Sequence, residues 1–393
     1  MQNYQAKFTK SIDLLKEQYR YREFIELARK AGEYPRGFSP KAAQEIIVWC
    51  SNDYLAMGQN QDVLAELYQA AQKYGVGAGG TRNIAGNSVA LKELEDFMAE
   101  FHAKEAALVF TSGYVANQAA IYAVTQVLEQ PVIFSDRYNH ASIIEGIKSS
   151  GCAKEVFAHN DMTDLEVKLQ KYPKDQDKLI IFEGVYSMNG SKGKAQEIVA
   201  LAKKYNALTY IDEVHAVGLY GEKGQGIAAE AGVAADIDII QGTFAKAYGL
   251  IGGYITGKQP TIDVVRSYAP GFIFTTAMPP AMAVAAKKSV ELVAEDLAAR
   301  EKFHANIKLL KQKLTAANIE FMQNDSHVIS VMIRDAQKVK RVADNLLLKH
   351  QIYIQPINYP TVAKGSERLR VTLTPYHSEE LMDQLVDALL AEI

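Results

Sequence analysis

The central part of the chain alternates short apolar runs with longer amphipathic stretches. The apolar runs that predict buried strands cover residues 107–110, 132–134, 155–157, 179–182, 208–211 and 237–240, and a further run ends at residue 254. Between them, helices are predicted over residues 111–127, 143–148 and 197–205. Strands that alternate with helices indicate a mostly parallel sheet with helices on both faces.

The two ends of the chain follow other patterns. Apolar side chains near helical spacing predict a helix over residues 5–31, followed by a strand over 46–50 and a helix over 63–74. After two prolines, an Ala-rich helical region covers 281–317, with a charged break near 301–302. A smaller α+β segment follows, with strands at 328–333, 352–354 and 369–373 and helices at 336–349 and 378–393. The predicted division is an N-terminal helical segment (1–45), a large domain (46–290) and a small C-terminal domain (291–393).

Composition narrows the class of protein. With 393 residues, 48% hydrophobic and 23% charged, the chain has the profile of a globular protein with a sizeable core. A net charge of -3 gives no general attraction to nucleic acid or to anionic lipid. Cys50 and Cys152 lack the spacing of a metal site, so no metal is expected. No apolar run is long enough to span a membrane, and the N-terminal residues lack a signal-peptide pattern, which favours a cytoplasmic location.

Polar side chains follow the predicted strands where they end. Ser112, His140, Asp212 and Lys246 all fall at such ends, where α/β folds bind ligands. Lys246 lies on a loop of small residues, and His215 follows Asp212 by three positions. A lysine can bond an aldehyde cofactor while an acid keeps its pyridine nitrogen protonated.

Each of these features also has a purely structural interpretation. A single lysine is usually a solvated surface group, and a single acid after a strand is often a turn or cap residue. The glycine-rich residues 75–83 match neither a dinucleotide-binding fingerprint nor a P-loop, which argues against a nicotinamide-dependent oxidoreductase. They favour a flexible gate or a close approach of backbone to ligand. The Ser-Gly turn at 112–113 could hold a phosphate at a helix start.

Six blocks in one order make the chain recognisable: residues 48–55, 77–84, 136–146, 212–218, 267–276 and 355–362. From about Tyr21 to the C-terminus it resembles the α-oxoamine synthases, fold type I pyridoxal phosphate (PLP) enzymes that join an amino acid to an acyl-CoA with loss of carbon dioxide. The resemblance implies an α/β transferase with a large, mostly parallel sheet domain and a smaller α+β C-terminal domain. It also implies a homodimer with active sites shared at the interface.

The resemblance assigns cofactor roles residue by residue. Lys246 would bond the cofactor aldehyde and then remove the Cα proton of the amino acid, while Asp212 would pair with the pyridinium nitrogen. His215 would bond the phenolic oxygen of the cofactor, and His140 would stack on its ring. The other cofactor contacts implied are Ser112, Gly113, Tyr114, Ser187 and Thr243, with Thr275 and Thr276 supplied by the partner subunit.

On the substrate side the resemblance points to glycine and succinyl-CoA. Arg370 matches the residue that grips the amino-acid carboxylate, and Thr81 matches a position that favours glycine by crowding a side chain. Arg22 aligns with the arginine that pairs with the distal carboxylate of succinyl-CoA, although without the match it reads as a solvated charge. Other positions expected to contact succinyl-CoA are Asn52, Ser135, Lys154 and Thr361.

Several positions depart from the family pattern, and alternatives remain open. Gly184, Asn189 and Ser191 stand where the family has a serine and two aspartates; Leu91, Ala245 and Leu373 replace a histidine, a glycine and a proline. The product would feed tetrapyrrole (haem) synthesis or a secondary pathway. The rival interpretations are a sister enzyme, either 2-amino-3-ketobutyrate CoA ligase or 8-amino-7-oxononanoate synthase, and a PLP-binding homologue without turnover.

Overall fold

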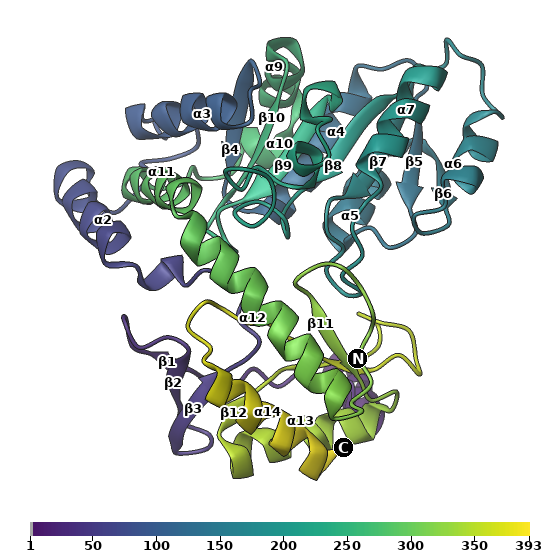
Figure 1. The fold of residues 1–393 in the computed structure, drawn as a ribbon. Helices are drawn as coiled ribbons and strands as arrows, with labels where there is room; N and C mark the ends of the chain where they lie inside the picture. The colour runs from purple at the N-terminus through teal and green to yellow at the C-terminus, as the bar shows by residue number, and fades with distance from the viewer. Residues whose placement is uncertain (1–2) are drawn as a thin grey trace. The chain divides into compact units, whose positions relative to one another are not determined.

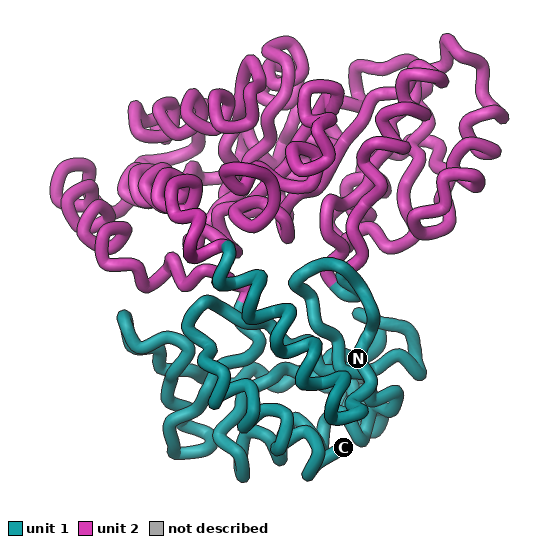
Figure 2. Tube along the Cα trace, viewed as in Figure 1, with its two compact units in different colours: residues 1–51, 188–190, 301–393 teal, residues 52–187, 191–300 magenta. Residues whose placement is uncertain are grey.

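The chain folds into two compact units in the computed structural model, which describes residues 3–393 (Figures 1 and 2). The terminal unit comprises the described residues through Ser51, residues 188–190 and residues 301–393. The sheet unit comprises residues 52–187 and 191–300. Both ends of the chain therefore belong to the same unit. Within residues 3–393, no helix has both the length and the apolar character that crossing a membrane requires.

A seven-stranded sheet forms the centre of the sheet unit (Figure 1). Its strands are β4 (Ala106–Phe110), β5 (Val132–Asp136), β6 (Ala153–Phe157), β7 (Lys178–Glu183), β8 (Leu208–Asp212), β9 (Ile239–Thr243) and β10 (Gly253–Gly257). Their order is β4-β10-β9-β8-β7-β5-β6, and only β10 runs antiparallel to its neighbours. The mostly parallel sheet predicted from the apolar runs is confirmed. The carboxyl ends of the other six strands consequently meet at one edge.

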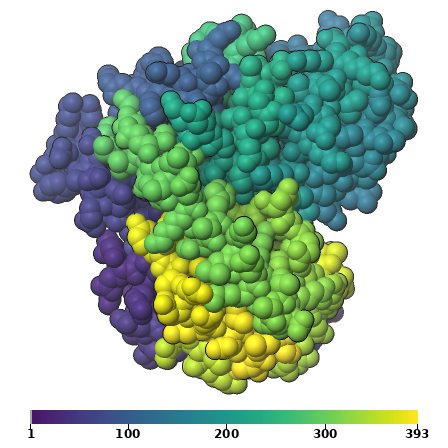
Figure 3. Space-filling view, viewed as in Figure 1, coloured from purple at the N-terminus to yellow at the C-terminus, as the bar shows by residue number. Residues whose placement is uncertain are grey.

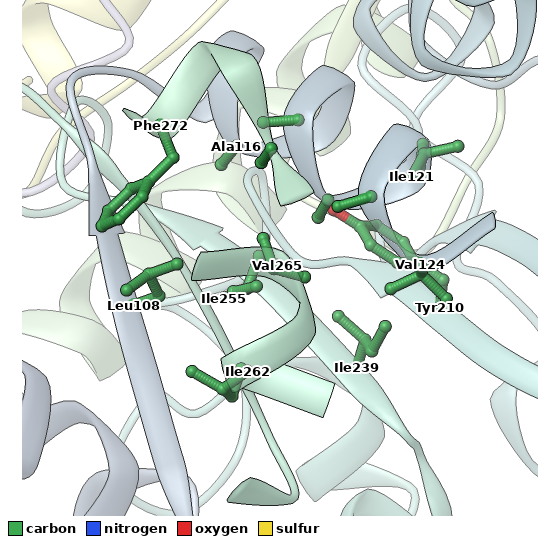
Figure 4. Close-up of a cluster of buried hydrophobic side chains, with 14 of the residues drawn as sticks. Leu108, Ala116, Ile121, Val124, Tyr210, Ile239, Ile255, Ile262, Val265 and Phe272 are labelled. Atoms are coloured by element: carbon green, nitrogen blue, oxygen red, sulfur yellow. The ribbon is translucent and has the colours of Figure 1, made fainter. Parts of the chain in front are cut away.

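Helices lie around this sheet; some pack on its strands, and others pack on neighbouring helices. They are α2 (Gln61–Tyr74), α3 (Val89–Phe101), α4 (Gly113–Gln126), α5 (Ala141–Ser150), α6 (Met162–Leu169), α7 (Ala195–Tyr205), α8 (Ile227–Glu230), α9 (Gln259–Tyr268), α10 (Pro270–Ile273) and α11 (Pro280–Glu295). In Figure 4, Val265 of α9 and Phe272 of α10 lie beside Leu108 and Ile255 of the sheet, and Ile121 of α4 lies toward Tyr210 in the same buried cluster. Helix α4 begins shortly after β4 ends. Its packing on the sheet therefore holds its first turn beside the ends of β4 and β9.

Two small sheets form the terminal unit. The first contains β1 (Ala28–Arg29), β2 (Arg36–Ser39), β3 (Gln44–Val48) and β12 (Ile352–Tyr353); the second contains β11 (Ile329–Met332), β14 (Arg368–Val371) and β13 (Pro356–Ile357). Helices α13 (Ala336–His350) and α14 (Glu379–Glu392) belong to the same unit. Helix α14 buries Met382, Leu385 and Leu389, and the C-terminal residues, yellow in Figure 3, line the visible surface of this unit.

Two helix predictions are wrong in their bounds. The helix expected over residues 5–31 ends early: α1 covers Tyr4–Glu17, and residues 28–29 form β1 instead. Tyr19 adopts a left-handed backbone (φ 53°), which a continuous helix cannot contain. The Ala-rich region breaks at Asp296 (φ -87°, ψ 75°), between α11 and α12 (Leu297–Ala316), and not near residues 301–302.

Candidate active site

The common edge of the parallel strands gathers the polar residues of the site. Asp136, Glu183, Asp212 and Thr243 are the last residues of β5, β7, β8 and β9, and Ser112 follows β4 by two positions. Asp212, Glu183, Asp136 and Thr243 are all buried. Buried polar groups need partners, and hydrogen bonds supply them for Asp212 and Thr243.

Lys246 and His215 lie against each other. Lys246 Nζ is 2.5 Å from His215 Nε2, and the other ring nitrogen, Nδ1, is 2.8 Å from the hydroxyl of Tyr54. Tyr54 is fully buried, so it fixes the orientation of the imidazole. Asn52 joins the same group, because the Tyr54 hydroxyl is 3.3 Å from its Oδ1. The lysine amine and the histidine can therefore reach the same part of a bound ligand.

The loop that carries Lys246 is shaped by its small residues. Thr243 Oγ1 accepts the N–H of Ala245 at 3.1 Å and donates to the Gly252 carbonyl at 2.7 Å. Gly249 has φ 71°, and a Cβ there would lie 2.0 Å from the backbone nitrogen of Gly58. Only glycine fits this position, so the sequence determines where the lysine loop turns.

Asp212 is held as a hydrogen-bond acceptor. Its Oδ1 accepts the Val214 N–H at 2.9 Å, and its Oδ2 accepts from Asn117 Nδ2 at 2.7 Å. With 4% exposure, the carboxylate is shielded from water. A buried acid with fixed orientation suits the role of pairing with a protonated ring nitrogen.

His140 caps the start of α5 and is itself exposed. Partial burial of the imidazole lowers its pKa; in smaller measure Asp212 raises it and Lys246 lowers it. The ring of Tyr114 meets it edge-on with centroids 6.4 Å apart. The lowered pKa favours the neutral imidazole, which is suited to packing on an aromatic ring.

The N-terminus of α4 offers an anion site. Ser112 is its N-cap, with Oγ accepting the Val115 N–H at 3.1 Å. At Gly113 a Cβ would lie 3.2 Å from Gln241 Nε2 and 3.4 Å from Thr243 Cβ, so a larger residue would crowd the helix start. Free backbone N–H groups and the helix dipole favour a phosphate at such a position.

Glu183, the last residue of β7, and the adjacent Gly184 are both buried. Burial first, and then the neighbouring charge of Asp212, raise the pKa of Glu183 well above its usual range. A Cβ at Gly184 would lie 2.0 Å from Glu213 Oε2, and Glu213 accepts the N–H groups of Ile227 and Ala228. Glycine at 184 thus leaves room for the Glu213 carboxylate, whose pKa burial raises to about 7.

The other predicted site residues of the sheet unit lie on several different strands and loops. Thr81 forms an isolated antiparallel bridge with Thr276, next to Thr275. Ser135 is buried on β5 and accepts from Asn139 Nδ2 at 2.9 Å, while Lys154 is exposed on β6. Ser187 is half-buried and is the last residue of the unit's first segment, residues 52–187. Their assigned contacts with cofactor or substrate stay predictions.

Three predicted substrate residues belong to the terminal unit. Arg22 Nη2 lies 3.4 Å from the hydroxyl of Thr361, and both line a cavity of about 400 Å³. The guanidinium of Arg20 stacks 4.5 Å from the ring centre of Tyr359, which further fastens the two segments together. Arg370 is buried on β14, 7% exposed. The structure therefore brings Arg22 and Thr361 together, and their contact with succinyl-CoA stays a prediction.

Four residues that sequence reasoning missed take part in these contacts: Tyr54, Asn117, Ser142 and Glu183. Tyr54 and Ser142 lie inside recognised blocks, and Asn117 and Thr125 are the polar residues among the buried positions of α4. A polar side chain in a largely apolar helix was the available signal for Asn117. Among the described residues, no group of His, Cys, Asp and Glu side chains could hold a metal ion.

Comparison with known proteins identifies the class. The family model for class I and II aminotransferases matches residues 44–389. A 5-aminolevulinate synthase of Bradyrhizobium diazoefficiens is 50% identical over 390 residues, which cover 99% of this chain and 95% of the relative. A Sphingomonas wittichii serine palmitoyltransferase (SPT) has a TM-score of 0.91 at 30% identity, covering 98% of this chain and 96% of that one. A solved structure of SPT with PLP also has a TM-score of 0.91, at 27% identity and the same coverage.

The chain therefore belongs to the class I and II aminotransferase family, and its cofactor is PLP. Its place in that family is among the 5-aminolevulinate synthases, the branch that the substrate motifs indicated. The residues present fit the cofactor: Lys246 can meet its aldehyde, Asp212 its ring nitrogen and the start of α4 its phosphate. The fold class predicted from the sequence, an α/β PLP-dependent transferase, is confirmed.

Proposed function

We infer that this chain catalyses the reaction of a 5-aminolevulinate synthase. Glycine, succinyl-CoA and a proton give 5-aminolevulinate, CoA and carbon dioxide. The observation that carries this conclusion is the cluster of Lys246, His215 and Asp212 at the strand edge, in a chain half identical to a 5-aminolevulinate synthase over nearly its whole length. If any of these three residues were absent from the sequence, a PLP-binding protein without turnover would be the better interpretation.

Each residue of the cluster has a proposed chemical task. When bound, PLP supplies a conjugated ring that takes up the electron pairs freed during the reaction. The Lys246 amine would bond the aldehyde of the cofactor and, when free, would accept the glycine Cα proton. Asp212 would lie beside the ring nitrogen, and His215, whose ring is held by Tyr54, would orient the Lys246 amine.

The bond changes balance without a further reactant. The glycine Cα–H bond breaks, with the proton passing to Lys246, and Cα then bonds the succinyl carbonyl carbon. The carbon–sulfur bond breaks and CoA leaves as a thiol. The former glycine carboxylate leaves as carbon dioxide, and a proton replaces it at Cα. We propose Arg370 as the cation that binds this carboxylate, because a guanidinium matches its two oxygens.

A direct assay tests the reaction. The protein is mixed with PLP, glycine and one of three acyl-CoAs, and CoA release and the mass of the aminoketone are measured. Succinyl-CoA is expected to give the highest kcat/KM. Faster turnover of acetyl-CoA or pimeloyl-CoA would assign the chain to 2-amino-3-ketobutyrate CoA ligase or 8-amino-7-oxononanoate synthase.

Replacing Arg22 by Leu tests the choice of succinyl-CoA. We expect KM for succinyl-CoA to rise roughly ten- to a hundredfold, since one charge-assisted hydrogen bond to a carboxylate is lost. KM for butyryl-CoA, which lacks the distal carboxylate, should change by less than about threefold. Initial rates of CoA release with both acyl-CoAs provide the comparison.

The matched control for Arg22 is Arg29→Leu. Arg29 is also exposed in the terminal unit, on β1, and lies outside the cavity that Arg22 lines. Its replacement should leave both KM values near those of the unchanged enzyme. Equal rises for succinyl-CoA and butyryl-CoA in Arg22→Leu would remove Arg22 from carboxylate recognition.

We further propose a homodimer in the cytoplasm, with Thr275 and Thr276 serving the site of the partner subunit. Exposed apolar side chains support the dimer: Val76, Ile84 and Phe274 are 83%, 80% and 77% exposed near the Thr81–Thr276 bridge. A second copy would remove this surface from water. Sedimentation should give twice the mass of the chain, and Ile84→Asp together with Phe274→Asp should shift the protein to monomers. A monomer in the unchanged protein would contradict the proposal.

A further inference from the structure

A buried chain of hydrogen bonds joins Asp212 to His140. Asn117 Nδ2 donates to Asp212 Oδ2 at 2.7 Å and to Ser142 Oγ at 2.9 Å. Ser142 Oγ lies 2.8 Å from His140 Nδ1. Asn117 and Ser142 are each only 1% exposed, so water does not compete for these contacts. Two residues proposed to contact the PLP ring are thus linked by two residues that the motifs left without a role.

The direction of donation along these hydrogen bonds is set by Tyr210. Tyr210 donates its hydroxyl to Asn117 Oδ1 at 2.8 Å, so the amide NH₂ of Asn117 must face the two acceptors. Ser142 Oγ accepts from Asn117, and its own hydrogen is therefore directed to His140 Nδ1. The backbone N–H of Ser142 reaches the same nitrogen at 3.2 Å. His140 Nδ1 acts as an acceptor, and the neutral ring carries its hydrogen on Nε2.

Helix packing brings the two middle residues within reach. One turn beyond Ser142 on α5, Gly146 faces α4, where a Cβ would lie 3.1 Å from Ile121 Cβ and 3.2 Å from Gln118 Cα. Ile121 is in turn one turn beyond Asn117 on α4. A larger residue at 146 would push the two helices apart near the point where Asn117 meets Ser142. The hydrogen bond between Asn117 and Ser142 therefore depends on this close approach of the helices.

We propose that Asn117 and Ser142 are positioning residues that couple the carboxylate of Asp212 to the tautomer of His140, so that the two groups orient PLP together. The inference rests on the cofactor roles proposed above for Asp212 and His140. Asn117 turns the Asp212 carboxylate toward its ligand, and Ser142 keeps a hydrogen off His140 Nδ1. Loss of either link leaves the other group in place but no longer held in one orientation.

The first test is Ser142→Ala, which removes the hydroxyl between Asn117 and His140 and leaves the hydrogen bond from Asn117 to Asp212 in place. The affinity of the cofactor-free protein for PLP, measured by equilibrium dialysis, is expected to fall about tenfold. The pH dependence of the absorbance of bound PLP should shift, because His140 Nδ1 loses its hydroxyl donor while Asp212 and Lys246 still face the ring. Ser142→Thr, which keeps the hydroxyl, should restore both quantities. The matched control is Ser149→Ala on the same helix, since its hydroxyl bonds only the Gly146 carbonyl among the contacts described.

A double-mutant cycle with Asn117→Ala tests the coupling itself. The affinity loss in the double variant should be smaller than the product of the two separate losses. Additive effects, or an unchanged absorbance profile in Ser142→Ala, would overturn the proposal. Urea unfolding of the cofactor-free variants separates a folding defect from a binding defect. These readouts need no acyl-CoA, so failure of the coupling and failure of the proposed reaction are distinguishable.

Discussion

Replacing Lys246 by Ala is expected to lower kcat by about 10⁴-fold or more, because one amine performs two tasks in the proposed reaction. It bonds the aldehyde of PLP, and it then removes the Cα proton of glycine. The adjacent His215, whose Nε2 lies 2.5 Å from the amine and whose ring is held by Tyr54, has no amine to bond the aldehyde. CoA release with glycine and succinyl-CoA measures the loss.

Lys246→Arg makes the test more specific. Arginine keeps the positive charge but cannot form the bond to the aldehyde or act as a base, so this variant should be as inactive as the alanine variant. Lys258→Ala is the matched control, since Lys258 is an exposed lysine of the same unit before α9. Activity in Lys246→Ala above about one per cent would move the base to another residue. PLP should still bind, because the anion site at the start of α4 is unchanged.

The sheet could be predicted from the sequence because its strands are buried on both faces. Every residue of β4, β5, β7 and β9 is buried, which leaves a continuous hydrophobic signal in the apolar runs of these strands. The helix expected over 5–31 failed for the opposite reason. None of the residues of α1 is buried, so no packing requirement extended it beyond Glu17.

The residues of the site could be predicted from motifs, but their connections could not. Asp212, His215 and Lys246 follow strands and form a local pattern in the chain. The bonds that orient them join residues far apart: Asn117 and Asp212 are separated by 95 positions, and Tyr54 and His215 by 161. Spacing along the chain carries no information on such pairs, since the packing of helices and loops around the sheet brings them together.

Replacing Asp212 by Ala is expected to lower kcat roughly 10²- to 10³-fold, the size of effect typical for the loss of one preorganised charge partner. Without the carboxylate, the ring nitrogen of PLP loses the negative charge that keeps it protonated, and the ring holds the freed electron pair less well. Lys246 and the start of α4 still bind the cofactor, so its affinity should fall less than the rate. Single-turnover kinetics and dialysis of PLP separate the two quantities.

Alanine at 212 also leaves two donors without this acceptor, one buried N–H of the Asn117 amide and the partly buried Val214 N–H, which costs up to about 1–3 kcal/mol of stability for each. Asp212→Asn distinguishes this structural cost from the electrostatic one, because its carbonyl oxygen can accept one of these hydrogen bonds but carries no charge. Its stability to urea should partly recover while its rate stays low. Asp238→Asn is the matched control, since Asp238 accepts from Thr209 at the opposite end of the same sheet and should affect stability alone. Recovery of rate together with stability in Asp212→Asn would show that the charge is dispensable and that Asp212 serves only to hold its neighbours.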